Sequence, residues 1–286
     1  MTDSKTGADK LAVYPLGTAG WIPSNGMETC CFAFLWGTEL IIIDAGTGIA
    51  RLVELKRSIF KSSWKNISRV RIFLTHYHLD HCVGLFWMRG IFGELPIRIH
   101  APGEWAYGKT AYDILNGLFK KPYSPYPMIE LNPNITVEDM IPEGFQIGED
   151  ASPLHVRSKL NMNHSDPSIA FRFGDFFAFV SDTPPEEETI EFVRGVKVLL
   201  HESYYGSFES FGDENDSLEK HTDTRHTGSM GAGLISKRAG VLSLYLIHHN
   251  PERDMRDAEN DAKRVSESLG LNCRAAKDLE EITIEM

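Results

Sequence analysis

The sequence predicts a single-domain α/β fold in which β-sheets pack together and helices cover their outer faces. Short runs rich in β-branched and aromatic residues recur along the chain, and most are bounded by Gly, Pro, Asn or Asp, as strands usually are. Longer segments with helical spacing of apolar residues lie between and after these runs. Because no low-complexity linker or internal repeat divides the chain, one domain spanning residues 1–286 is expected.

The predicted strands follow this pattern in chain order. They are residues 11–16, 30–36, 40–44, 70–75, 97–100, 170–173, 176–181, 196–201 and 241–248. The predicted helices are residues 49–60, 81–91, 104–118, 186–194, 228–238 and 254–269. Residues 120–142, which contain five prolines, are expected to form a long loop or insertion, with a substrate-facing lid as the alternative.

The composition of the chain limits the expected binding partners and the expected cellular location. The net charge of −11 provides no overall positive field for a phosphate backbone, so a large nucleic acid is not the expected partner. Residues 1–10 are polar and no apolar stretch of 18 residues occurs, so a cytoplasmic protein without membrane association is expected. Cys30, Cys31, Cys82 and Cys273 lack metal or disulfide spacing and are expected to be reduced and mostly buried.

The densest group of metal donors lies in residues 76–81, here called the metal loop. His76, His78, Asp80 and His81 follow a predicted strand and precede a helix-like segment. In a tight loop these positions can point toward two neighbouring centres. Zinc and similar ions bind imidazole nitrogen and carboxylate oxygen, and a catalytic site leaves one position open for water. Four donors within six residues therefore favour two metal sites over one.

Further donors stand singly beside other predicted strands. His164 precedes the strand at 170–173, Asp182 follows the strand at 176–181, and His248 closes the strand at 241–248. An isolated histidine at a strand end is usually a surface or packed residue. Together with the metal loop, however, these three residues are candidate ligands that would complete two sites.

Segments distributed along the chain resemble, in order, the signature motifs of the metallo-β-lactamase superfamily. They are residues 16–20 (LGTAG), residues 43–48 (IDAGTG), the metal loop, His164, Asp182 and His248. The resemblance implies an αββα sandwich with a dinuclear site at one edge of its two sheets. It also implies that His76, His78 and His164 hold one metal, that Asp80, His81 and His248 hold the other, and that Asp182 bridges them. Asp44 would brace the metal loop without being a ligand.

Later motifs indicate a branch within that superfamily. Asp182 argues against β-lactam hydrolysis, because β-lactamases of this fold typically lack a bridging aspartate and use a cysteine in the second site. Residues 199–203 (LLHES), 225–229 (RHTGS) and 246–251 (LIHHNP) are similar to motifs of the tRNase Z and phosphodiesterase branch. By that resemblance, Glu202 and His226 would assist cleavage of a phosphodiester. Thr-Gly-Ser after His226 and Ser203 differ from the usual residues, which leaves the substrate open.

The chemistry of phosphodiester cleavage supports the same roles. It needs an activated water, neutralised phosphoryl oxygens and a protonated leaving group. Two divalent ions supply the first two through a metal-bridged hydroxide, with zinc expected and manganese or iron as alternatives. His226 would donate the proton, Glu202 would raise the pKa of His226, and the start of the next helix would favour an anion. Asp80, His226 and Glu202 are therefore the catalytic candidates.

The expected function is that of a phosphodiesterase acting on a small phosphodiester or cyclic phosphate. Three alternatives stay open. The first is a tRNase Z-like RNA endonuclease without the usual arm, because residues 164–182 suffice only for a hairpin turning near Gly174. The second is a thioester or ester hydrolase of the glyoxalase II type, in which Glu202 and His226 would be incidental. The third is a non-enzymatic binding module. A homodimer is compatible with each of them.

Overall fold

The computed structural model describes residues 10–131, 133–148, 153–206, 215–223 and 225–286. Residues 1–9, which belong to the polar N-terminal segment, lie outside these ranges. None of the helices in the described ranges is long and apolar enough to cross a membrane.

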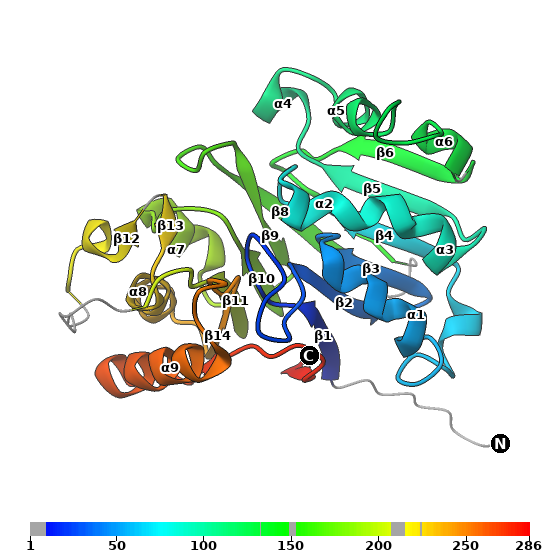
Figure 1. Ribbon diagram of the computed structural model, residues 1–286. Coiled ribbons are helices and arrows are strands. Elements are labelled where there is room, and N and C mark those ends of the chain that lie inside the picture. The colour runs from blue at the N-terminus through cyan, green and yellow to red at the C-terminus, as the bar shows by residue number, and fades with distance from the viewer. Residues whose placement is uncertain (1–9, 132, 149–152, 207–214, 224) are drawn as a thin grey trace.

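Two seven-stranded sheets form the centre of the molecule (Figure 1). The first contains, in spatial order, β16 (Ile282–Glu285), β1 (Lys10–Gly17), β2 (Cys31–Trp36), β3 (Glu39–Ile43), β4 (Arg69–Phe73), β5 (Ile97–Ala101) and β6 (Ile135–Asp139). The second contains β15 (Cys273–Ala275), β14 (Ser243–Ile247), β11 (Val198–Glu202), β10 (Phe177–Val180), β9 (Ser168–Phe173), β8 (Leu154–Asn161) and β7 (Phe145–Ile147). A small third sheet pairs β12 (Thr222–Asp223) with β13 (His226–Thr227).

Each large sheet combines an antiparallel half with a parallel half. In the first sheet, β16, β1, β2 and β3 pair antiparallel, whereas β3, β4, β5 and β6 pair parallel. In the second, β7 to β10 pair antiparallel, whereas β10, β11, β14 and β15 pair parallel. Parallel neighbours place their carboxyl ends at the same edge, where loops converge.

Helices cover the outer face of each sheet (Figure 1). The first sheet is covered by α1 (Leu52–Leu55), α2 (Leu79–Cys82), α3 (Met88–Phe92), α5 (Ala111–Leu118) and α6 (Met128–Leu131). Trp105 of α4 (Glu104–Tyr107) packs instead against the core between the sheets. The second is covered by α7 (Glu187–Val193), α8 (Ser229–Ala239) and α9 (Met255–Leu269). The predicted αββα sandwich in a single domain is confirmed.

Phenylalanines fill the layer between the two sheets. Phe34 of β2 meets Phe173 of β9 edge to face at 5.4 Å, and Phe32 meets Phe179 of β10 at 5.2 Å. All four side chains are fully buried. Edge-to-face pairs of this kind add to the free energy gained from burial of the rings. The two sheets are therefore fixed against each other at the layer that supports the site.

Three of the predicted helices are interrupted in the structure. Residues 49–60 form a 3-10 turn, η1 (Thr47–Arg51), then α1 and irregular turns. Residues 81–91 are divided among α2, η3 (Val83–Trp87) and α3, because Gly84 packs closely against the loop after β3. Residues 104–118 are divided into α4 and α5 at Gly108, whose φ of 64° ends α4. The predictions at 186–194, 228–238 and 254–269 correspond to α7, α8 and α9.

The loop prediction for residues 120–142 is wrong in part. Residues 120–127 lack regular structure, but α6 and the edge strand β6 follow. Alternation of Ile135 and Val137 with polar neighbours is the strand signal that the prolines obscured. The described strands β7, β8, β15 and β16 were also not predicted, and β7, β15 and β16 are only three or four residues long.

The cysteine prediction is confirmed. Cys30, Cys31, Cys82 and Cys273 are all buried, and none forms a disulfide. Burial raises the pKa of Cys30, whose Sγ lies 3.6 Å from Oδ2 of Asp44. These thiols belong to the core and are not candidate nucleophiles.

Candidate metal centre

The candidate site forms where strands of both sheets end. Asp44 follows β3 and the metal loop follows β4, while Asp182 follows β10 and His248 follows β14. Asp44, Asp182 and His248 each adopt a positive φ, of 57°, 52° and 55° respectively. This conformation is uncommon for residues with a side chain and turns the chain sharply at the strand end. Each turn directs a polar side chain toward the edge between the sheets.

Four donor atoms converge on the second predicted metal position. Nε2 of His81 lies 3.0 Å from Oδ2 of Asp182, 3.3 Å from Oδ2 of Asp80 and 3.2 Å from Nε2 of His248. Nε2 of His248 lies 3.5 Å from Oδ2 of Asp80 and 3.4 Å from Oδ2 of Asp182. The two nitrogens and two carboxylate oxygens therefore surround one small volume.

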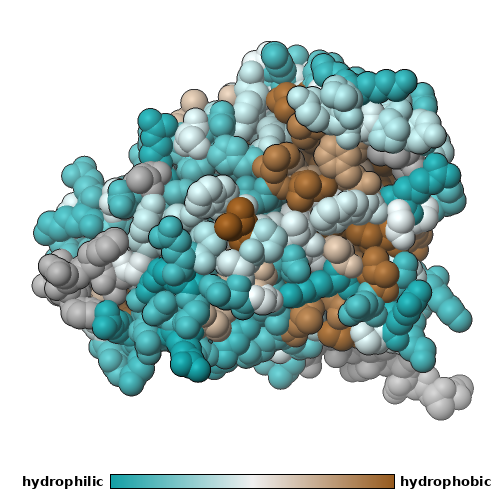
Figure 2. Space-filling model, viewed as in Figure 1, coloured by the Kyte–Doolittle hydropathy of each residue, from teal (hydrophilic) through white to brown (hydrophobic). Residues whose placement is uncertain are grey.

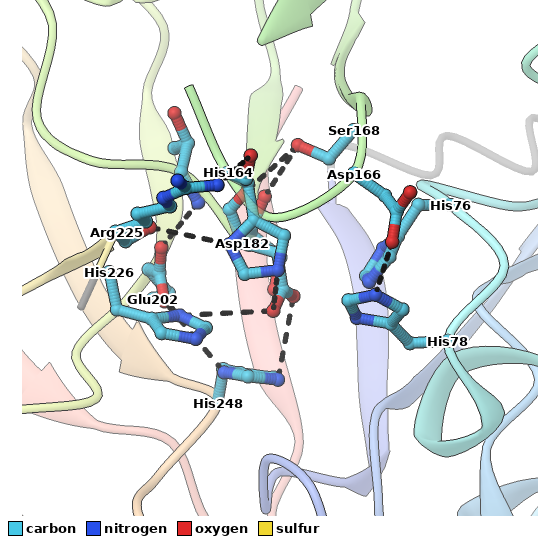
Figure 3. A network of polar contacts seen from close by, with 12 residues as sticks. His76, His78, His164, Asp166, Ser168, Asp182, Glu202, Arg225, His226 and His248 are labelled. Carbon is cyan, nitrogen blue, oxygen red and sulfur yellow. Dashed lines mark hydrogen bonds and ion pairs between the residues drawn. The ribbon is translucent and has the colours of Figure 1, made fainter. Parts of the chain in front are cut away.

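Three histidines gather at the first predicted position (Figure 3). His76, His78 and His164 each bring a ring nitrogen within 4.8 Å of the other two. Oδ1 of Asp182 lies 3.7 Å from Nε2 of His164, whereas its Oδ2 faces His81 and His248. The two oxygens of Asp182 are thus shared between the two groups, which is the arrangement that a bridging ligand requires.

Asp44 braces the metal loop, as the sequence suggested. Its Oδ1 accepts a hydrogen bond from the backbone N–H of Thr75 at 2.7 Å, and its Oδ2 accepts one from Oγ1 of Thr75 at 2.9 Å. Nδ1 of His81 lies 2.8 Å from the same Oδ2. A carboxylate bound to Nδ1 fixes the imidazole orientation and directs Nε2 into the site.

The electrostatic balance of the cluster favours a cation. Burial lowers the pKa of His76 well below its usual value and also lowers that of His164, so both rings are kept in the neutral, ligand-competent form. Burial opposes ionisation of Asp182, but His248 and His81 hold its pKa well below the usual range. Ionised carboxylates inside a protein need positive charge beside them.

Buried nitrogen atoms without hydrogen-bond partners also indicate that these donors could bind divalent metal ions. Nε2 of His76 and Nε2 of His164 are buried and have no hydrogen-bond partner among the described residues. Buried polar atoms of this kind are normally satisfied, so a missing ligand is expected beside them. Imidazole nitrogens mixed with carboxylate oxygens are ligands suited to zinc, manganese and iron.

Glu202 and His226 form a close pair beside this cluster (Figure 3). Nδ1 of His226 lies 2.7 Å from Oε2 of Glu202, and Oε1 of Glu202 accepts a hydrogen bond from the N–H of Thr183 at 2.6 Å. Burial disfavours the imidazolium, but the charge of Glu202 and its hydrogen bond raise the pKa of His226 to about 9. The imidazole of His226 therefore holds its second proton more strongly than an ordinary histidine does.

A pocket of about 280 Å³ opens at the cluster. Its walls are formed by Trp21, His78, Asp80, His164, Ser165, Asp182, Tyr204, Tyr205, His226 and His248. No described residue of the segment 120–142 belongs to this set, so the lid alternative for the proline-rich segment is not supported. All the predicted site residues are brought together at the cluster or against it.

Three residues at the site were not predicted from the sequence. Asp166 places its Oδ2 at 3.1 Å from Nε2 of His78, which leaves Nδ1 of that ring for a metal. Tyr204 stacks on His226 with ring centres 4.5 Å apart. Trp21 donates its backbone N–H to Oδ2 of Asp80 at 2.8 Å. Asp166 and Tyr204 each lie two positions after a predicted site residue, and this closeness in sequence is the feature that could have indicated them.

Two backbone N–H groups at the start of α8, where an anion was expected to bind, have partners within the protein. The N–H of Gly228 donates to the carbonyl of His221, and the N–H of Ser229 donates to the carbonyl of Tyr205. These two backbone N–H groups are therefore paired within the protein.

Comparison with known proteins places this geometry in a family. Residues 33–214, more than half of the chain, match the pattern of the Metallo-beta-lactamase superfamily. The chain belongs to the metallo-β-lactamase superfamily. It is accordingly a metal-dependent hydrolase, and the use of divalent metals, typically zinc, is a property of the family to which it belongs.

Similar members of the metallo-β-lactamase superfamily include a ribonuclease Z from Clostridium tetani. It is 26% identical, over 82% of this chain and 87% of its own. The metallo-β-lactamase fold protein YhfI from Bacillus subtilis shares the fold with a TM-score of 0.70 at 18% identity, covering 96% of this chain and 99% of its own. The short form of human tRNase Z has a TM-score of 0.64 at 16% identity, covering 96% of this chain and 100% of its own.

These relatives bear on the expected partners. The C. tetani relative is named a ribonuclease, so the expectation that a large nucleic acid is not a partner receives no support from it. The net charge of the whole chain is a weak guide, because affinity for a phosphate backbone depends on the charges at the contact surface.

Proposed function

We propose that this member of the metallo-β-lactamase superfamily is a dinuclear phosphodiesterase acting on a small phosphodiester or cyclic phosphate. The observation that carries the proposal is the contact between Nδ1 of His226 and Oε2 of Glu202, beside the group of seven candidate ligands. A proton donor at that place matches the need of phosphodiester cleavage to protonate an alkoxide leaving group.

The metal ligands follow from the two groups of donors. His76, His78 and His164 would hold one ion, Asp80, His81 and His248 would hold the second, and Asp182 would bridge them. When bound, the ions would neutralise charge on the phosphoryl oxygens and lower the pKa of the attacking water. Zinc is the expected ion, with manganese and iron as alternatives.

His226 has the role of general acid. Glu202 occupies Nδ1 of the imidazole, so Nε2 is the nitrogen available to the substrate. As water attacks phosphorus and the bond from phosphorus to the leaving oxygen breaks, Nε2 of His226 donates its proton to that oxygen. Solvent then returns a proton to the neutral imidazole, which stays in place beside Glu202.

The short segment between His164 and Asp182 favours a substrate of modest size. It contains β9 and β10, which pair antiparallel around Gly174, where φ is 54°. This hairpin is part of the central sheet and is not an extended arm. A small diester needs only the pocket beside the cluster, whereas a folded RNA needs additional contact surface.

RNA cleavage is the second candidate function. It is favoured by the similarity to ribonuclease Z from C. tetani, which extends over most of both chains. The same ligands and the same His226 and Glu202 pair would serve this reaction, because the bond that breaks is again a phosphodiester. The two candidates differ in the size of the substrate and not in its chemistry.

Turnover of matched substrates tests the proposal. The purified protein, loaded in turn with zinc, manganese and iron, should hydrolyse bis(p-nitrophenyl) phosphate and cyclic nucleotides. The variant His76→Ala should lose this activity, whereas His155→Ala, which changes an exposed histidine of β8, should keep it. No turnover above His76→Ala with any of the three metals would contradict the proposal.

The same preparations distinguish the alternatives. Cleavage of a precursor tRNA at much lower concentration than the small diesters would favour RNA as the substrate. Hydrolysis of S-lactoylglutathione that persists in His226→Ala would favour a thioesterase of the glyoxalase II type. In that case Glu202 and His226 would be incidental to the reaction.

A further inference from the structure

We propose that Trp21 is a specificity-determining residue that stacks against a planar ring carried by the ester group that stays on the phosphate when the leaving group departs. This inference rests on the proposed phosphodiesterase function and adds a subsite to it. The evidence lies in the segment of residues 18–29, here called the Trp21 loop, which runs between β1 and β2 and reaches the candidate metal centre.

The Trp21 loop is held directly against the metal cluster. A side chain at Gly20 would place its Cβ only 2.5 Å from Cε1 of His248, so the backbone passes immediately over that imidazole. The N–H of Gly20 donates to the carbonyl of His249 at 2.9 Å, and the N–H of Trp21 donates to Oδ2 of Asp80 at 2.8 Å. The position of Trp21 is therefore tied to two candidate metal ligands.

The backbone at Trp21 adopts a conformation that bulky residues rarely accept. Its φ is 63°, in the left-handed region, which is an outlier for a large side chain. Such a conformation is energetically unfavourable and tends to occur at functional sites. Here it is combined with the backbone contact to Asp80, so the loop orients Trp21 with respect to the cluster.

The indole itself lacks support from the fold. Trp21 is 66% exposed although it belongs to the walls of the pocket. Among the described residues, its indole forms no aromatic ring pair, and the hydrogen bond to Asp80 uses the backbone N–H and not the indole. Figure 2 shows further apolar surface over α2, the helix that begins within the metal loop. A large exposed ring at the mouth of a reaction pocket is available to bind a ligand.

The other walls indicate what kind of group would bind. Tyr204 and Tyr205 add aromatic rings to the pocket, and Tyr204 already stacks on His226. The described residues that line the pocket include no lysine or arginine. A second phosphate on the substrate would therefore find no cationic partner there, whereas a neutral planar ring would find a stacking surface. A nucleobase next to the scissile phosphate satisfies this condition.

Two esters with the same leaving group test the subsite. One is the p-nitrophenyl ester of thymidine 5′-monophosphate, and the other is methyl p-nitrophenyl phosphate. Stacking of one base changes affinity by roughly ten- to a hundredfold. We therefore expect Trp21→Leu to raise KM for the thymidine ester by about that factor with little change in kcat, and to leave the methyl ester unaffected. Trp21→Phe, which restores a ring, should recover most of the loss.

The control is Ile22→Ala, which changes an exposed apolar neighbour in the same loop. It should behave as the wild type on both esters. An equal loss on both esters in Trp21→Leu would overturn the proposal in favour of a loop-positioning role. Full activity of Trp21→Leu on the thymidine ester would overturn it in favour of apolar contact without stacking.

A binding measurement separates this proposal from the proposed function. Calorimetric titration of the metal-loaded protein with thymidine 5′-monophosphate and with inorganic phosphate requires no turnover. Weaker binding of the nucleotide, but not of phosphate, in Trp21→Leu supports the subsite even if neither ester is hydrolysed. Equal nucleotide affinity in the wild type and in Trp21→Leu would overturn it, whatever the activity.

Discussion

Nδ1 of His226 lies 2.7 Å from Oε2 of Glu202, and one face of the same imidazole stacks on the ring of Tyr204. Glu202 itself is fully buried and is fixed at its other oxygen by the N–H of Thr183. A histidine held in this way has a defined orientation and a raised pKa. Under the proposed function, the pair would give the metal centre a proton donor that the ligands alone do not supply.

Removal of the imidazole should affect poor leaving groups most. In His226→Ala we expect kcat for a cyclic nucleotide to fall by roughly 100- to 10,000-fold, the range for loss of a general acid. With bis(p-nitrophenyl) phosphate the loss should be much smaller, because nitrophenolate leaves without protonation. Steady-state kinetics on both substrates measure the difference. Equal losses on the two substrates would argue against a general acid.

The pH dependence of kcat/KM should depend on the carboxylate of Glu202. The pKa of His226 is raised to about 9, so the proton is present below that pH and is lost as the pH rises through it. In Glu202→Gln the main cause of the rise is removed, and the alkaline fall in kcat/KM should move to lower pH, toward the ordinary histidine value of about 6.5. An unchanged alkaline limb in a folded Glu202→Gln variant would contradict this account.

Asp44 should control metal affinity without touching the metal. Its Oδ2 lies 2.8 Å from Nδ1 of His81, and loss of such a partner typically weakens metal binding by roughly 10- to 100-fold. We therefore expect Asp44→Asn to bind the zinc ion that His81 would hold with reduced affinity in a competition titration against a chelator. Asp113→Asn, at an exposed aspartate of α5, is the matched control. Equal zinc affinity in Asp44→Asn and Asp113→Asn would contradict the role of Asp44 in positioning His81.

Metal binding should stabilise the folded chain. The cluster buries Asp182 near His76 and His164, whose Nε2 atoms lack hydrogen-bond partners. Ligands that bind only the native state raise stability by about 2.7 kcal/mol per site at 100 times Kd. Thermal unfolding should therefore shift upward by several degrees when zinc or manganese is added. Asp182→Ala should lose most of this shift. A shift of the same size in Asp182→Ala would mean that the stabilising ions bind elsewhere.

Much of the site could be predicted because its signals are local or lie at strand ends. Four donors of the metal loop fall within six residues, and Asp182 and His248 directly follow apolar runs that form β10 and β14. Because the carboxyl ends of parallel strands meet at one edge of a sheet, the sequence pattern predicts that these residues lie close together. The structure adds the sharing of Asp182 between two groups, which depends on atomic positions.

Other features depend on tertiary contact and could not be predicted. Helix 81–91 is interrupted because Gly84 packs against the loop after β3, a contact between segments far apart in the sequence. The edge strands β7, β15 and β16 are short, so periodicity is weak over their length. Trp21 reaches the site only through a loop held over His248, and nothing in its local sequence indicates that.

The most direct test of the dinuclear phosphodiesterase is a metal titration of the metal-free protein with bis(p-nitrophenyl) phosphate hydrolysis as the readout. The account predicts that the rate rises until two equivalents of metal per chain are bound, with metal content measured by mass spectrometry. It also predicts that Asp182→Ala, which removes the shared carboxylate, stays inactive at every metal concentration. A maximal rate at one equivalent, or full activity in Asp182→Ala, would contradict the account.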